Sequence, residues 1–245
     1  MVSQLDFSVA LVLGLAPALG VMYWSIRRFD IPFTEYRLFD DRRMFGGLAA
    51  GLIFGAVAGF VEEQPLGNVL GAILALVAFL VFEESFKMVW LNRKSYRGRF
   101  DTTFYGVSVG VGTAAMLVVA DVLTFMGRGG ALYTVENLAL YLLFSASFSL
   151  IQADTGVLIG FGASRGETIW PFLKAVLVRL AHAAMLLAFS LGADEPWSLI
   201  AVVTSIVFAA ILYHYVYTVL LPATLPEDVR REMKREKRRD RRANA

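Results

Sequence analysis

Long apolar stretches, separated by short charged or turn-forming segments, run along almost the whole chain and constrain its fold more than any other feature. A helix that crosses a bilayer needs about 20 predominantly apolar residues. The sequence therefore predicts seven membrane spans, near residues 8–26, 44–61, 67–91, 102–126, 137–162, 169–192 and 197–221. Hydrophobic residues make up 57% of the chain and charged residues 18%, whereas a soluble domain carries about 25% charge. This composition argues against a soluble enzyme and against a nucleic-acid partner.

Positive charges gather in alternate connections between the predicted spans. Cytoplasmic loops of membrane proteins carry an excess of Lys and Arg, so the first, third and fifth connections should face the cytoplasm. We expect an all-α bundle of seven transmembrane helices over residues 1–225, in the plasma membrane, with the N-terminus outside and the C-terminus cytoplasmic. The cations that carry this prediction are Arg27, Arg28, Arg37, Arg42, Arg43, Arg93, Lys94, Arg97, Arg99 and Arg165.

The last segment, residues 226–245, reads PEDVRREMKREKRRDRRANA and has almost no apolar residues. A segment of this kind cannot bury a core, so we expect a basic, mobile cytoplasmic tail. Two roles remain open. The tail could bind anionic lipid headgroups, or it could be a solvated segment that only enforces the topology.

Several polar residues fall inside the predicted spans. Ionisable side chains in a membrane are costly and usually face the bundle interior. Because a helix rises about 1.5 Å per residue, Glu83, Gln152, Arg179 and His182 should lie at a similar depth, where one polar cavity could collect them. The full set is Glu83, Glu84, Lys87, Asp121, Gln152, Asp154, Arg179, His182 and His214.

The sequence EESFK at 83–87 is the most informative polar motif. Glu83 and Lys87 are four residues apart and should pair on one helix face, whereas Glu84 should point about 100° away. A free carboxyl there could take a proton from water and return it to a leaving group. The alternative is that both Glu residues pair with Lys87 and Arg179 and only hold helices together.

Other polar positions have more modest expectations. Asp121 is near the outer end of its span and should cap or face the interface, and His214 should be structural within an aromatic belt.

Glu83, Glu84 and His182 could hold a single divalent metal with water, although a site without metal is equally open. The sequence has no Cys, which excludes disulfides and Cys-ligated metals.

Three segments resemble the PrsW-type and CAAX-type intramembrane protease superfamily, which includes the Aph (anterior pharynx defective) subunit of gamma-secretase. EESFK at 83–87 is similar to the EExxK motif of PrsW proteins, and FDTTFYGVSVGVG at 100–112 resembles their FD-x-x-x-YG-x-x-x-G segment. LAHAAMLLAF at 180–189 is similar to the helix that carries the family histidine, here His182. Leu117 and Val118 replace a Glu-Asn pair of PrsW proteins, and Gln152 replaces a histidine.

The resemblance implies two possible functions. In an intramembrane endopeptidase, Glu83 or Glu84 would activate water, and His182 with Gln152 would stabilise the oxyanion formed on a membrane protein or peptide substrate. In a non-catalytic relative of the Aph subunit, the same residues would fix helices in a scaffold that binds a partner membrane protein. Lys87, Arg179, Asp154 and Asp121 would support either site.

Two glycines predict close helix packing. Gly106 and Gly110 form a small-xxx-small pair, a spacing that lets the backbone of another membrane helix approach closely. We therefore expect a neighbouring helix to pack directly on this face.

Overall fold

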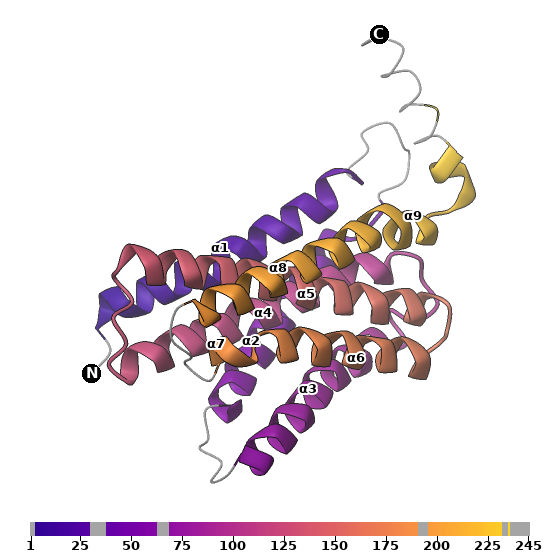
Figure 1. Cartoon of the computed structure of the whole chain (residues 1–245). Coiled ribbons are helices and arrows are strands. Elements are labelled where there is room, and N and C mark those ends of the chain that lie inside the picture. The colour runs from indigo at the N-terminus through magenta and orange to yellow at the C-terminus, as the bar shows by residue number, and fades with distance from the viewer. Residues whose placement is uncertain (1–2, 30–37, 63–68, 191–195, 232–234, 236–245) are drawn as a thin grey trace.

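The computed structural model describes residues 3–29, 38–62, 69–190, 196–231 and 235, and the regular structure of these residues is entirely helical (Figure 1). This confirms the all-α prediction. At their described ends the helices agree with the predicted spans to within four residues, except at the sixth span. The elements are α1 (Gln4–Arg27), α2 (Asp41–Glu62), α3 (Val69–Leu91), α4 (Thr102–Gly127), α5 (Val135–Ser164), α6 (Ile169–Met185), α7 (Leu187–Ser190), α8 (Trp197–Tyr215), the π-helical η1 (Val216–Leu220) and α9 (Leu221–Thr224).

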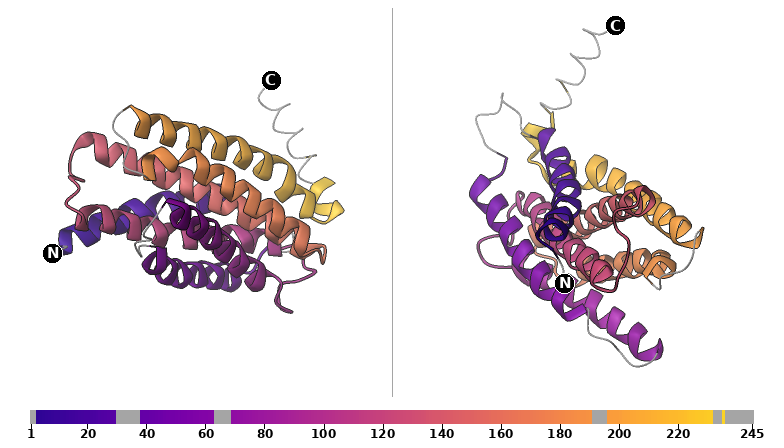
Figure 2. Two further views of the ribbon diagram at one scale, coloured as in Figure 1. Left: turned by 60° about the horizontal axis from the view of Figure 1, so that its bottom comes forward. Right: turned by 90° about the vertical axis from the view of Figure 1, so that its left-hand side faces the viewer.

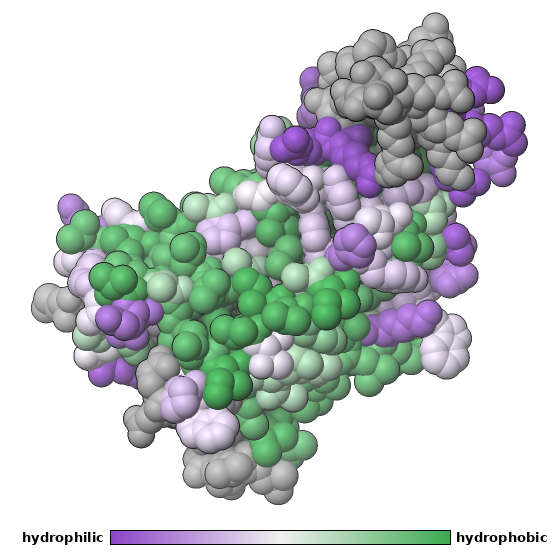
Figure 3. All heavy atoms as spheres, turned by 45° about the horizontal axis from the view of Figure 1, so that its top comes forward, coloured by the Kyte–Doolittle hydropathy of each residue, from purple (hydrophilic) through white to green (hydrophobic). Residues whose placement is uncertain are grey.

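Within the described residues, four helices are long and apolar enough to cross a membrane. They are α1, α4, α5 and the continuous run Trp197–Thr224, which joins α8, η1 and α9. Side chains along the body of the molecule are mostly hydrophobic on the face in Figure 3, and hydrophilic ones gather towards one end. The chain is thus built as a membrane protein.

The predicted sixth span, 169–192, is wrong as a single helix. α6 ends at Met185, and the N–H of Leu186 donates to the carbonyls of both His182 and Ala184, which tightens the last turn before α7 begins. Residues 191 and 192 lie outside the described part of the chain. With 17 residues, α6 is at the short end of the roughly 17 to 25 residues that membrane-spanning helices have.

Helix α4 lies at the centre of the bundle, because glycines allow close contact on two of its sides. A Cβ on Gly110 would lie 2.0 Å from the carbonyl oxygen of Gln152 in α5, and a Cβ on Gly51 of α2 would lie 2.3 Å from that of Val109. The close approach predicted for the Gly106 and Gly110 face is therefore confirmed. Figure 2 shows α2 with α3 on one side of this central helix and α8 on the opposite side.

Helix α1 contains Pro17, which has no N–H to donate to the carbonyl of Leu13 one turn earlier. Ser145 of α5 supplies the missing donor, because its hydroxyl donates to that carbonyl at 2.6 Å. In a membrane, a proline in a helix is tolerated when a neighbouring side chain satisfies the freed backbone group. The serine thereby fixes α1 against α5.

The end of the last long helix widens into a π-helical turn. The N–H of Leu221 donates to the carbonyl of Val216, five residues earlier. Pro222 follows directly and cannot donate to the carbonyl of Thr218, so the regular α-helical ladder is interrupted at this point. Of the predicted tail, 226–245, residues 226–231 and 235 are described, and Glu227 pairs with Arg231 at 3.0 Å.

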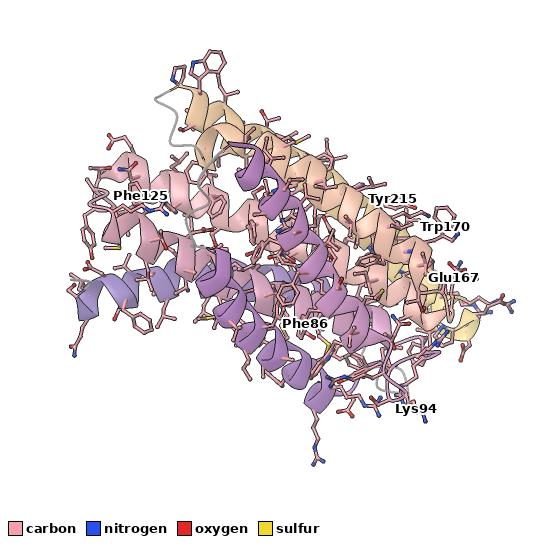
Figure 4. The ribbon with its side chains drawn as sticks, turned by 90° about the horizontal axis from the view of Figure 1, so that it is seen from below. Phe86, Lys94, Phe125, Glu167, Trp170 and Tyr215 are labelled. Carbon is pink, nitrogen blue, oxygen red and sulfur yellow. The ribbon has the colours of Figure 1, made fainter. Side chains whose placement is uncertain are left out.

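Arginines next to aromatic rings mark one end of the bundle. Arg27 is the last residue of α1, Arg93 follows α3 and Arg165 follows α5. Their guanidinium groups lie 5.0, 3.8 and 4.1 Å from the ring centroids of Trp24, Trp90 and Phe161. Such arginine and aromatic side chains are typical of a membrane interface. Figure 4 shows Lys94 and Glu167 at this same end and Phe125 at the opposite end.

The FDTTFYG motif fastens the start of α2 to the start of α4. The carboxylate of Asp101 accepts two hydrogen bonds from Arg99, at 3.0 and 2.8 Å, and one from the hydroxyl of Tyr105 at 2.9 Å. The Tyr105 hydroxyl in turn accepts from the backbone N–H of Asp40 at 2.9 Å. The hydrogen bonds to Asp101 also raise the pKa of the Arg99 guanidinium. In this chain the motif has a structural role, because its hydrogen bonds join the start of α4 to the start of α2.

Candidate functional site: a buried ion network

Six buried side chains from α3, α5 and α6 form one ion network. They are Glu83, Glu84 and Lys87 of α3, Gln152 and Thr155 of α5, and Arg179 of α6. Five are fully buried and Arg179 is 2% exposed. The sequence predicted that Glu83, Gln152 and Arg179 share a depth, and the structure brings these three together.

Both acids pair with Lys87 and Arg179, as the alternative for the EESFK motif expected, but Lys87 pairs with Glu84 and not with Glu83. Lys87 Nζ lies 2.7 Å from Glu84 Oε1, and Arg179 Nη2 lies 2.6 Å from Glu83 Oε2. The predicted pair of Glu83 with Lys87 is therefore wrong. Residues three and four apart on a helix share a face, so the spacing allowed Lys87 to pair with either Glu. Glu83 pairs with Arg179 of another helix instead.

Helix α5 connects the two ion pairs through Gln152. The amide oxygen of Gln152 accepts from Lys87, and its Nε2 donates to the Glu83 carboxylate at 3.3 and 3.4 Å. A glutamine side chain offers an acceptor and donors without carrying a charge. Gln152 can therefore contact one cation and one anion without adding to the charge of the network.

Thr155 is a member that the sequence prediction missed. Its hydroxyl accepts from Lys87 at 2.7 Å and donates to Glu84 Oε1 at 3.1 Å. Thr155 follows Gln152 by three residues and so shares its helix face. This spacing is the sequence signal that could have identified Thr155 as a member of the network.

The network contains two acids and two bases, so its formal charges cancel. Taking ions out of water is costly, and a buried ion pair regains that cost only with good geometry and further hydrogen bonds. Removal of one partner leaves an uncompensated buried charge and destabilises the fold by about 3 to 5 kcal/mol. The network therefore holds α3 against α5 and α6 by making any arrangement that separates these charges unfavourable.

His182 does not share a hydrogen bond or ion pair with Glu83 or Glu84. Its Nε2 lies 2.9 Å from the hydroxyl of Ser147 in α5, which lies 3.0 Å from the hydroxyl of Ser205 in α8. These contacts place His182 in a polar junction of α5, α6 and α8. The predicted site in which His182 lies beside the Glu pair is not formed by direct contacts.

The proton positions in this junction follow from counting donors. Ser205 also donates to the carbonyl of Val202 at 2.8 Å, so Ser147 can donate to Ser205 and accept from His182 Nε2–H. The opposite direction would require a buried N–H at His182 Nδ1, which has no hydrogen-bond partner among the described residues. Nδ1 lacks a partner in either case, but a proton on Nε2 allows three hydrogen bonds, donated by His182, Ser147 and Ser205, whereas the opposite direction allows two. This places the His182 proton on Nε2 and makes Ser147 an acceptor for histidine.

The remaining predicted residues lie outside both groups. Asp154 is fully buried on a different face of α5, and neither of its carboxylate oxygens has a hydrogen-bond partner among the described residues. Asp121 is partly exposed in the second half of α4. His214 is exposed on α8, as expected for a residue of an aromatic belt.

Within the described residues no group of three or more His, Cys, Asp or Glu could hold a metal ion. Glu83, Glu84 and His182 therefore do not form the predicted ligand set. The physical reason is that Arg179 and Lys87 occupy the two carboxylates, whereas His182 bonds to Ser147.

A few atoms of the ion network keep unused hydrogen-bonding capacity. Glu84 Oε2 and Arg179 Nη1 have no hydrogen-bond partner among the described residues. The guanidinium group of Arg179 lies 4.6 Å from the ring centroid of Phe148, which compensates part of its charge. Buried polar atoms are almost always satisfied in proteins, so these atoms are where a water molecule or a polar ligand group would bind.

Comparison with models of protein families, with curated proteins and with solved structures finds no match. Function is therefore inferred from the fold and from the geometry of the buried polar groups.

Proposed function

We propose that this chain is a seven-span protein of the plasma membrane, with its N-terminus outside and its C-terminus in the cytoplasm. Support comes from the cations of the first, third and fifth connections and from the arginine and aromatic pairs at one end of the bundle. The basic tail then lies on the cytoplasmic side, where it can bind anionic lipids.

The function that the geometry supports best is a non-catalytic membrane scaffold similar to the Aph subunit, which binds a partner membrane protein. The observation that carries this proposal is the pairing of both acids, Glu83 with Arg179 and Glu84 with Lys87, in full burial. A general base needs access to its proton donor, whereas a carboxylate that joins helices does not. The association with a partner rests on the resemblance alone.

A specific observation favours a second candidate, the intramembrane endopeptidase. Glu84 Oε2 is buried without a hydrogen-bond partner among the described residues, in the same carboxylate whose other oxygen lies 3.6 Å from Arg179 Nε. A water bound to Glu84 Oε2 would be next to a base and near a cation that could stabilise an oxyanion. In that case Glu84, and not Glu83, is the residue that activates water.

The test compares wild type with Glu83→Gln and Glu84→Gln in bilayers that contain a panel of single-span substrates. The scaffold proposal predicts no cleavage by wild type and a membrane partner that co-purifies with wild type but not with His182→Ala. Cleavage by wild type that Glu84→Gln abolishes would reject the scaffold and support the endopeptidase, because a general base contributes about 10² to 10⁴ in rate. Absence of both cleavage and a partner would reject both proposals.

A further inference from the structure

Asp154 is a buried acid that neither candidate function uses. Its side chain is fully buried, and both carboxylate oxygens lack a hydrogen-bond partner among the described residues. At 100° per residue, Asp154 points about 200° away from Gln152 and about 100° away from Thr155. The cations Lys87 and Arg179 are already paired with the two Glu residues of α3, so they do not compensate Asp154.

The helix register places Asp154 on the face of α5 that contacts α8. Ser147 and Asp154 are seven residues apart, which is about two turns, so they share a face of α5. Ser147 contacts Ser205 of α8, and α5 and α8 run in the same direction along the bundle (Figure 1). Tyr213 is eight residues beyond Ser205, also about two turns, so Tyr213 of α8 lies at a level similar to that of Asp154.

At this level a hydrogen bond between two hydroxyl groups joins α8 to α1. The Tyr213 hydroxyl lies 2.8 Å from the hydroxyl of Ser25 in α1, and Ser25 is fully buried. The contact between α8 and α1 is therefore made at the level of Asp154. The π-helical turn Val216–Leu220 begins three residues after Tyr213, and π-helical turns are frequent at functional sites.

An isolated carboxylate in this position would be very unfavourable, since ionised groups in a low-dielectric interior require a counter-charge. Within the described residues no set of three acidic or histidine side chains is available to hold a metal ion. A proton, by contrast, needs no further ligand, and it removes the charge that makes a buried carboxylate unfavourable. We infer that Asp154 is a proton-binding site in the membrane interior, occupied at neutral pH, on the face of α5 that contacts α8. This inference does not depend on the proposed scaffold function.

Infrared spectroscopy of the full chain in bilayers at neutral pH tests the inference. Asp154→Asn should remove the C=O stretching band of a protonated carboxyl, a band that shifts in D₂O. The matched control is Asp228→Asn, because Asp228 is exposed after α9 and should lose only a carboxylate band. Loss of a carboxylate band in Asp154→Asn would overturn the inference.

Two further measurements keep the test decisive. The wild-type spectrum alone must contain a protonated carboxyl band at neutral pH, so its absence overturns the inference even if Asp154→Asn does not fold. Spectra recorded with sodium and with choline as the cation should be identical for this band. A band that converts to carboxylate when sodium is added would show that Asp154 binds a metal cation instead of a proton.

Discussion

At the residue scale, pairing in the ion network depends on contacts between helices that spacing cannot specify. The sequence motif EESFK predicted that Lys87 pairs within α3, which is correct, but it selected Glu83 over Glu84. The partner choice is set by Arg179 of α6, which is 96 residues from Glu83 in sequence. The depths estimated from the helix rise correctly predicted that Glu83, Gln152 and Arg179 lie together. It could not resolve the rotation of α6, which turns His182 towards Ser147.

Gln152→Leu tests whether the amide of Gln152 connects the two ion pairs. Leucine removes an acceptor from Lys87 and a donor from Glu83, and hydrogen bonds to charged groups contribute about 1.5 to 3 kcal/mol each. We expect the free energy of unfolding, measured by detergent-induced unfolding in mixed micelles, to fall by at least that amount. The control Gln4→Leu alters an exposed residue of α1 and should change little. Equal stability of both variants would contradict the connecting role.

At the element scale, apolar runs predicted the existence of the long helices, because each run needs a helix to satisfy its backbone in a bilayer. The break at Leu186 and the π-helical turn before Leu221 were not predicted. The first has no Pro or Gly signal in the sequence at Leu186. The second involves Pro222, the first residue after the predicted span 197–221, and the end of an apolar run does not indicate a wider turn.

Ser145→Ala tests the contact between α1 and α5. The Leu13 carbonyl would lose its donor, and an unsatisfied buried acceptor costs about 1 to 3 kcal/mol. In Pro17→Ala the new N–H can donate to Leu13 within the helix, so the double variant should recover most of the lost stability. Ser8→Ala is the control, because Ser8 is exposed and bonds only to Gln4 in its own helix. Additive losses in the double variant would contradict this account.

Gly110→Ala tests the packing of α4 on α5. The added Cβ would lie 2.0 Å from the carbonyl oxygen of Gln152, so the two backbones must separate. Overpacking typically costs about 1 to 3 kcal/mol, and backbone atoms cannot move aside as a side chain can. Gly127→Ala, at the end of the same helix, meets no atom within 4 Å and should be tolerated. Comparable thermal midpoints for the two variants would show that α4 and α5 are less close than described.

At the scale of the whole molecule, the positions of cations predict the topology, because positively charged loops remain in the cytoplasm. An N-terminal tag should be accessible to antibody on intact cells, and a C-terminal tag only after permeabilisation. Detection of both tags on the same side would contradict an odd number of spans. The tail beyond Arg231 lies outside the described part of the chain, apart from residue 235, so its lipid binding stays a prediction from composition.

The proposed role of Glu83 and Glu84 is to stabilise the bundle through their ion pairs, with no part in a reaction. Its most direct test is the free energy of unfolding of Glu84→Gln, alone and combined with Lys87→Met. We predict that Glu84→Gln lowers stability by about 3 to 5 kcal/mol because Lys87 loses its buried counter-charge, and that the double variant is more stable than the sum of the single losses implies. A carboxylate that serves catalysis often lowers the stability of the fold. Its replacement by Gln would then leave the stability unchanged or increase it. If Glu84→Gln is as stable as wild type, or more stable, the structural role of the pair is contradicted.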